Sequence, residues 1–176
     1  MGTAKKQSKK YKPPLRTWDK TRIQRDAQLR KSYGFKNKKE LWKVESDLRN
    51  IRKRARDFVG LKALNLGQQE EQEFIRKLFS MGLVKEHATV DDVLELTIEN
   101  LMDRRLQSFV FKMGLAKSIR EARQLITHRH ILVNDRVIDT PSHLITTEEE
   151  KKIEYVSKSP LASEQHPVRV RMRKSE

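Results

Sequence analysis

The residues with the clearest chemical potential are six cationic side chains between Asp103 and Ile138. This segment is strongly basic, because Arg104 to Arg136 contains eight Lys/Arg and only two carboxylates, a net charge of +6. A guanidinium group binds phosphate through two parallel hydrogen bonds and also stacks on bases. For any single cation a solvated face remains the alternative, but the group as a whole predicts an RNA-binding surface. The six are Arg104, Arg105, Lys117, Arg120, Arg123 and Arg129.

Polar residues among these cations add to the expected RNA contacts. Ser118 is suited to cap a helix, and a phosphate could also bind its hydroxyl and the free N–H groups there. His128 and His130 invite a metal hypothesis, but two histidines without a nearby third ligand favour RNA contact or packing in a turn. We therefore expect no metal, and we add Gln124 with Ser118 and both histidines to the RNA-contact set.

The sequence gives little support to catalysis. Asp91-Asp92 and the run Glu148 to Glu150 lack a basic or histidine partner at useful spacing, so we interpret both as solvated. A Gly-rich phosphate loop, a Ser/His/Asp order and an HExxH motif are all missing from the sequence. We expect neither enzymatic activity nor a cofactor.

Two helices and a hairpin are expected to position the cations. Apolar residues spaced by three and four from Met102 to Met113 predict one amphipathic helix, which Gly114 can end in a left-handed conformation. Ser118, with Glu121 three residues later, predicts a capping box for a second helix. Short β runs then flank Asn134-Asp135, a pair suited to positive φ in a tight turn. One side of this unit should be buried and the other should form a cationic shelf.

The preceding residues predict a helical scaffold. A helix from Leu41 to Phe58 has one apolar seam and basic residues on its other faces, and Gly60 should stop it. Further helices are expected after Gly67 and after Thr89, whose capping box includes Asp92. The first helix supplies four more expected RNA contacts, namely Arg49, Arg52, Lys53 and Arg56.

The excess positive charge lies in the first third of the chain. Residues 1–56 contain twenty Lys/Arg and five Asp/Glu, whereas residues 57–176 contain nineteen of each, so the whole net charge of +15 is N-terminal. Within residues 57–103 carboxylates outnumber cations, as expected for packing scaffold. A cationic arm on a balanced globule favours nucleic acid as partner over an acidic membrane, because the segment lacks a continuous apolar face.

The two ends of the chain should differ from the folded middle. Residues 1–40 have few apolar side chains and should be largely disordered alone, with Trp18 and Tyr33 as anchors that dock or stack. Ile153 and Tyr155 predict a third strand, and Val168 to Lys174 could form an edge strand or a basic strip. There is no cysteine, secretory signal or apolar run of membrane-spanning length, which is compatible with a cytoplasmic protein.

The central segment resembles the S-four RNA-binding domain. The matching positions are Arg104, Gly114, Ala116, Ser118, Ala122, Arg123, Ile126, Ile131, Val133 and Asn134. The flanks, above all Tyr33 to Leu61, resemble archaeal and eukaryotic small-subunit ribosomal proteins of the same family, over roughly residues 14–160. Bacterial members usually carry Gly where Arg129 and Asp135 stand, and some carry a cysteine cluster for zinc, which this chain lacks. Zinc is therefore not carried over.

The residues and the resemblance together predict an α+β protein with a helical N-terminal half and a small RNA-binding module of two helices and a short antiparallel sheet. The expected divisions are a basic arm over residues 1–40, a helical scaffold over 41–101, the S-four domain over 102–160 and a basic tail over 161–176.

The resemblance also implies a role. It implies a structural constituent of the small ribosomal subunit that binds a junction in the 5′ domain of the rRNA, nucleates assembly and lies near the site where mRNA enters. The expected partners are small-subunit rRNA and neighbouring ribosomal proteins, including those that line the mRNA channel, with no membrane. A pre-rRNA processing factor and an RNA-modifying enzyme or its targeting subunit are the alternatives.

Overall fold

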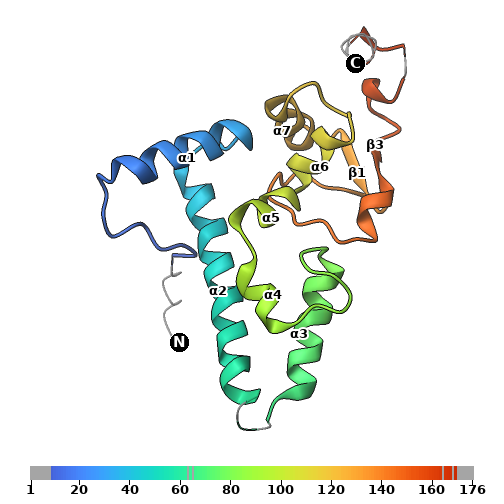
Figure 1. The fold of residues 1–176 in the computed structure, drawn as a ribbon. Helices are drawn as coiled ribbons and strands as arrows, with labels where there is room; N and C mark the ends of the chain where they lie inside the picture. The colour runs from blue at the N-terminus through green and yellow to red at the C-terminus, as the bar shows by residue number, and fades with distance from the viewer. Residues whose placement is uncertain (1–8, 63, 65, 164, 168, 170–176) are drawn as a thin grey trace, which may run out of the picture.

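The structure is a computed structural model that describes residues 9–62, 64, 66–163, 165–167 and 169 (Figure 1). Helices dominate the first two thirds of the chain, and a small sheet follows them. The helices are α1 (Lys20–Ser32), α2 (Lys38–Lys62), α3 (Gln68–Ser80), α4 (Val90–Glu95), α5 (Ile98–Asp103), α6 (Leu106–Lys112) and α7 (Ile119–Thr127). The strands are β1 (Ile131–Val133), β2 (Arg136–Val137) and β3 (Ile153–Tyr155), and two short 3₁₀ helices, η1 (Glu149–Lys152) and η2 (Pro160–Ala162), complete the order.

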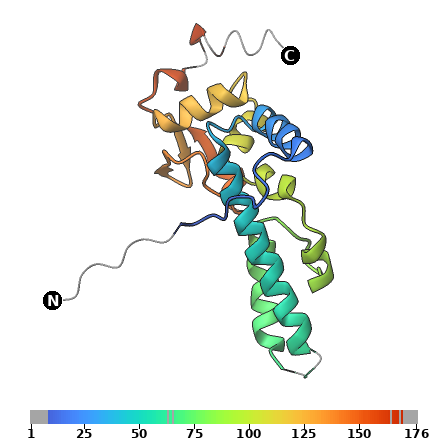
Figure 2. The same cartoon turned by 90° about the vertical axis from the view of Figure 1, so that its left-hand side faces the viewer.

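Helix α2 is the axis of the helical half. Figures 1 and 2 both show α3 running back along α2, with α4 and α5 packed beside them. The predicted apolar seam is confirmed, because Leu41, Leu48, Ala55 and Phe58 are buried. Gly60 does not stop the helix, which continues to Lys62. This expectation was wrong because a single glycine costs a helix only about 1 kcal/mol, which continued packing can offset.

The basic N-terminal segment is more ordered than its composition predicts. Asp19 caps the N-terminus of helix α1, where its carboxylate accepts from the N–H of Thr21 at 3.1 Å. Leu29 and Phe35 are buried in the same core as α2. Upstream, the Tyr11 ring lies 5.9 Å from that of Trp42. The expectation of disorder is therefore wrong for residues 20–40, because two well-placed apolar side chains dock α1 and its following turn.

The module has its own core, which begins at Leu106. Strand β1 lies between β2 and β3 in an antiparallel sheet, and α6 and α7 pack together beside it (Figure 1). The expected helix from Met102 to Met113 is instead divided into α5 and α6. The break forms because the N–H of Leu106 donates to the carbonyl of His143 at 2.8 Å, an acceptor outside the helix.

The predicted turns form as expected, and the two predicted capping boxes form in full at α4 and in part at α7. Asn134 and Asp135 both have positive φ (49° and 63°), and Gly114 has φ of 70°, as expected. Thr89 and Asp92 form a full capping box. At α7 only half of the box is present: Ser118 accepts from the Glu121 N–H at 3.2 Å, but the Glu121 carboxylate accepts from the N–H of Lys117 instead.

Two glycines should respond to alanine in opposite directions. Gly34 has φ of 62°, and a Cβ there would lie 2.8 Å from the Gln107 amide nitrogen and 2.9 Å from Ile119. Gly34→Ala should therefore destabilise the protein by about 2–3 kcal/mol, through left-handed strain and overpacking. Gly60→Ala, whose Cβ would meet no atom within 4 Å, should stabilise α2 by about 0.5–1 kcal/mol. Urea denaturation followed by circular dichroism measures both, and equal effects would contradict the packing assigned to Gly34.

Candidate nucleic-acid interface

Three of the six cations predicted as contacts in the module, Lys117, Arg120 and Arg129, remain accessible and lie around α7. Lys117, Arg120, Gln124, His128 and Arg129 are all exposed, and we call this set the α7 surface. No described carboxylate forms an ion pair with Lys117 or Arg120. Arg129 contacts Asp139 at 3.3 Å, but both side chains are mostly exposed, so water and salt screen this pair. The α7 surface therefore offers cations and hydrogen-bond donors that a polyanion can use.

The chain reverses direction sharply at both ends of β1. Arg129 has φ of 61° and Asp135 has φ of 63°, so both lie in the left-handed region. Glycine adopts such φ without strain, and the resemblance described above implies glycine at both positions in bacterial members. In this chain the turn after α7 therefore carries the cationic side chain of Arg129, where glycine would have no side chain.

The two histidines differ in their surroundings. His128 is exposed, whereas His130 is half-buried and its Nδ1 lies 2.9 Å from the Ser159 hydroxyl. Their rings stack with centroids 6.4 Å apart. Within the described part of the chain no three His, Asp or Glu side chains come together as a metal site. His130 thus serves packing in this structure, while His128 belongs to the α7 surface.

Arg123 does not lie on an open cationic shelf. Its two terminal nitrogens donate to the Glu40 carboxylate at 2.7 and 3.0 Å, and each side chain is less than a quarter exposed. Burial alone would raise the pKa of Glu40, but hydrogen bonds and positive charge from Arg123, with Arg105, hold it below its ordinary value. The expectation for Arg123 assumed a face without carboxylates, and Glu40 of α2 overturns that assumption.

Arg104 and Arg105 also turn inward. The Arg104 guanidinium pairs with Glu150, donates to the carbonyl of Ile145 at 2.9 Å and lies 4.8 Å from the centre of the Phe109 ring. Arg105 is only 4% exposed and lies 4.7 Å from the Phe35 ring centre. Arg105 therefore helps to join the helical half to the module, and Arg104 connects parts of the module with one another. The sequence prediction of surface contacts anticipated neither role.

The Glu148 to Glu150 run is structural rather than simply solvated. Besides the pair of Glu150 with Arg104, the Glu149 carboxylate accepts from the N–H of Thr146 at 2.9 Å and lies 3.6 Å from His143. Burial opposes ionisation, but the Thr146 hydrogen bonds and His143 lower the pKa of Glu149. Glu149 and Glu150 consequently fix the loop before β3, and our interpretation of the run as solvated was wrong for these two residues, whereas Glu148 is exposed.

A second basic region lies along α2. A hollow of about 410 Å³ is lined by Arg25 of α1 and by Arg49, Arg52 and Arg56 of α2, with Glu45 as its one lining carboxylate. Burial and Asp26 raise the pKa of Glu45 against the opposing charge of nearby arginines. Arg49, Lys53 and Arg56 are exposed, whereas Arg52 is half-buried and donates to the carbonyl of Leu96. Three of the four predicted α2 contacts are thus accessible.

Arg25 was missed because α1 was expected to be disordered. The available signal was Asp19, a favoured N-cap residue, followed by a stretch without glycine or proline as far as Tyr33. Tyr33 was expected as an anchor that docks or stacks. Its hydroxyl donates to Asp103 at 3.2 Å within the fold, and burial together with Asp103 raises its pKa to about 12. Trp18, by contrast, is 91% exposed.

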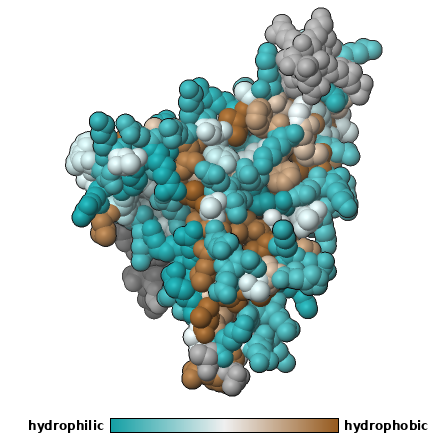
Figure 3. All heavy atoms as spheres, in the orientation of Figure 1, coloured by the Kyte–Doolittle hydropathy of each residue, from teal (hydrophilic) through white to brown (hydrophobic). Residues whose placement is uncertain are grey.

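Most of the proposed C-terminal strip, residues 168 and 170–174, lies outside the described residues. On the face shown in Figure 3, hydrophilic side chains cover most of the surface and hydrophobic ones form a narrow lengthwise band. Among the helices of the described chain, none combines the length and apolar character needed to cross a bilayer.

Comparison with known proteins adds an independent observation. The family described as "S4 domain" matches residues 104–151, which include α6, α7 and the β1–β2 hairpin. The small ribosomal subunit protein uS4 of Nanoarchaeum equitans is 44% identical over 172 residues, with 97% of this chain and 96% of the relative covered. The protein of the same name from Methanococcus maripaludis is 44% identical over 170 residues (96% and 95% covered), and that from Thermoplasma acidophilum is 45% identical over 171 residues (96% and 86%).

Proposed function

The chain belongs to the uS4 family of small ribosomal subunit proteins, and on that premise we propose that it binds a junction in the 5′ domain of small-subunit rRNA and nucleates assembly of the subunit. It is a structural component of the ribosome that binds rRNA, and it is not an enzyme. Its place in the cell is the cytoplasmic ribosome. In the assembled subunit it lies beside the proteins that line the channel by which mRNA enters.

The α7 surface is the observation that carries this proposal. Its exposed cations, Lys117, Arg120 and Arg129, come from the segment matched by the S4 domain. They contact phosphates and fix the register of the protein on the RNA, while the shape of the folded junction selects the site. Arg49, Lys53 and Arg56 supply a second set of phosphate contacts from α2, with Arg25 beside them.

The division of labour between the segments is part of the proposal. Residues 41–101 act as the scaffold that presents the α2 cations, and residues 102–160 act as the module that presents the α7 surface. Residues 1–40 supply the arm, whose exposed Trp18 stacks on a base or docks in a crevice between RNA helices. The tail from residue 161 adds further positive charge.

Stoichiometry in ribosome preparations tests the proposal. A structural constituent should co-sediment at one copy per mature small subunit, measured by quantitative mass spectrometry of sucrose-gradient fractions. A processing factor would be found with precursor particles only, and this result would overturn the assignment. The nucleation step is tested by adding the chain to an rRNA 5′-domain transcript with other purified small-subunit proteins and measuring whether their binding then increases.

A further inference from the structure

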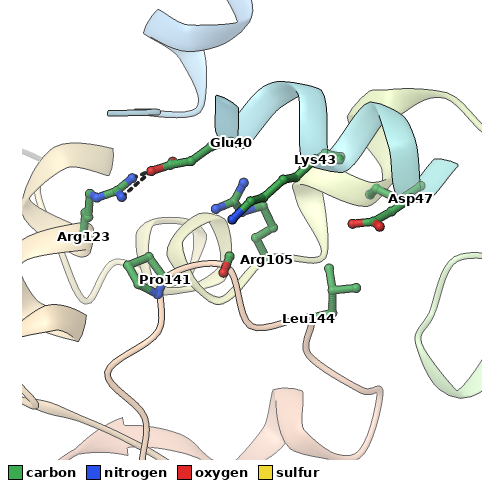
Figure 4. A pocket seen from close by; sticks show the side chains of 10 residues that line it. Glu40, Lys43, Asp47, Arg105, Arg123, Pro141 and Leu144 are labelled. Carbon is green, nitrogen blue, oxygen red and sulfur yellow. Dashed lines mark hydrogen bonds and ion pairs between the residues drawn. The ribbon is translucent and has the colours of Figure 1, made fainter. Parts of the chain in front are cut away.

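A hollow of about 270 Å³ lies where the helical half meets the module. Its size is near the lower end of the roughly 300–1,000 Å³ typical of small-molecule sites. Figure 4 shows Lys43 and Arg105 reaching into it between α2 and the loop that carries Pro141 and Leu144, with Asp47 at one side.

Arg105 lacks a hydrogen-bond acceptor for its guanidinium among the described residues. Arg105 is only 4% exposed. Its guanidinium makes no hydrogen bond to a described residue and instead stacks on the Phe35 ring, 4.7 Å from the ring centre. Burial lowers the pKa of Arg105 to about 10, against the favourable charge of Glu40. These donors reach the hollow without a described acceptor, so the hollow is suited to a ligand that brings acceptors.

Carboxylates in the same hollow narrow the chemistry of that ligand. Glu40 is occupied by two hydrogen bonds from Arg123, but Asp47 accepts no described hydrogen bond. Burial raises the pKa of Asp47, while Lys43 lowers it. A bare phosphate group has no donor for Asp47, whereas a ligand that carries N–H groups can donate to it. The ligand should therefore present acceptors on one edge and donors on another.

The remaining walls are apolar. Val44 and Leu101 line the side formed by α2 and α5, and Pro141 and Leu144 line the side formed by the loop. Apolar walls on both sides suit a flat ring that leaves its edges free for hydrogen bonds. A nucleobase has this form. Guanine presents O6 and N7 as acceptors, which Arg side chains favour, and carries N1–H and N2–H donors on its pairing edge.

We propose that this hollow holds one unpaired guanine of the small-subunit rRNA, with Arg105 donating to its O6 and N7 edge and Asp47 accepting from its N1 and N2 edge. The proposal rests on the proposed function and deepens it, because it adds a base-reading site to contacts that otherwise involve phosphates. Lys43, which is exposed at the rim, contacts the phosphate of the same nucleotide.

Chemical footprinting with kethoxal tests this site, since the reagent modifies N1 and N2 of unpaired guanines. The full chain is bound to a small-subunit rRNA transcript, and each guanine is compared with and without protein. We expect protection of one guanine that is lost in Asp47→Ala and in Leu144→Trp, which fills the hollow. Transcript affinity should fall by roughly 10-fold in each variant, the scale of one base contact.

Matched variants serve as controls and separate the possible outcomes. Asp57→Ala removes an exposed carboxylate further along α2, and Leu64→Trp enlarges an exposed leucine beyond the end of that helix. Both should bind normally and keep the protection. If wild type binds the transcript but neither hollow variant loses the protection of a guanine, this inference is wrong and the proposed function stands. If wild type does not bind, both are overturned.

Discussion

Reversing the charge of Arg120 and Arg129 together should weaken binding of small-subunit rRNA by about 100- to 1,000-fold while the helical circular-dichroism signal stays unchanged. Each exposed arginine makes a charge-assisted contact worth about 1.5–2 kcal/mol, and tenfold in affinity corresponds to about 1.4 kcal/mol. Neither residue holds the fold: Arg120 has no described ion pair, and the pair of Arg129 with Asp139 is exposed. The loss should therefore appear in RNA binding alone.

Filter binding at several salt concentrations measures this effect. Wild-type affinity should fall steeply with salt. In the double variant the slope of log K against log salt should be smaller in magnitude by about two. The matched control is Arg76→Glu with Lys85→Glu, which makes the same charge change at exposed positions in the region between α2 and α5. Equal weakening in the control would mean that only net charge matters, and the α7 surface would then have no special role.

Local patterns in the sequence predicted the module well. The positive φ at Asn134 and Asp135, the left-handed Gly114 and the Ser118 cap depend on neighbours within a few residues, so residue type and spacing indicate them. The antiparallel third strand followed from the alternation around Ile153. Helix α1 was missed because low apolar content argued for disorder, whereas its docking needs only a few apolar side chains, among them Leu29, Tyr33 and Phe35.

Long-range partners account for the errors in the site. Arg123 and Arg104 looked unpaired because their own segment has few carboxylates, but Glu40 is 83 residues and Glu150 is 46 residues away in sequence. Helical spacing indicates which face a residue occupies on its own helix and not which other helix covers that face. The same cations that suggest RNA binding are therefore divided, some in the α7 surface and others between the two halves of the protein.

This division has a consequence for assembly on RNA. The Arg123–Glu40 pair connects α7 with α2, and Arg105 stacks on Phe35 just before α2. The α7 surface and the cations of α2 are therefore held in a defined relative position before RNA arrives. Preorganisation of this kind reduces the entropy lost on binding, and it lets phosphate contacts from both surfaces form together. A variant that breaks the connection should thus lose stability first.

Arg123→Glu should destabilise the free protein by about 3–5 kcal/mol, the cost of breaking a largely buried ion pair. The change leaves Glu40 without its two hydrogen bonds and places a second carboxylate beside it. Urea denaturation without RNA measures the loss, so RNA contacts cannot contribute. The matched control is Arg120→Glu, an exposed position one turn earlier on α7, which should change stability by no more than about 0.5 kcal/mol.

A charge swap and acid titration identify the cause of this loss. Glu40→Arg combined with Arg123→Glu should recover part of the stability, whereas no recovery would mean that the arginine acts through packing alone. Because the folded pKa of Glu40 lies below its ordinary 4.5, the pair stabilises the protein above that value and loses its effect as the pH falls through the folded pKa. The stability difference between wild type and Glu40→Gln should therefore shrink in acid, and a difference that stayed constant there would exclude the ion pair as its source.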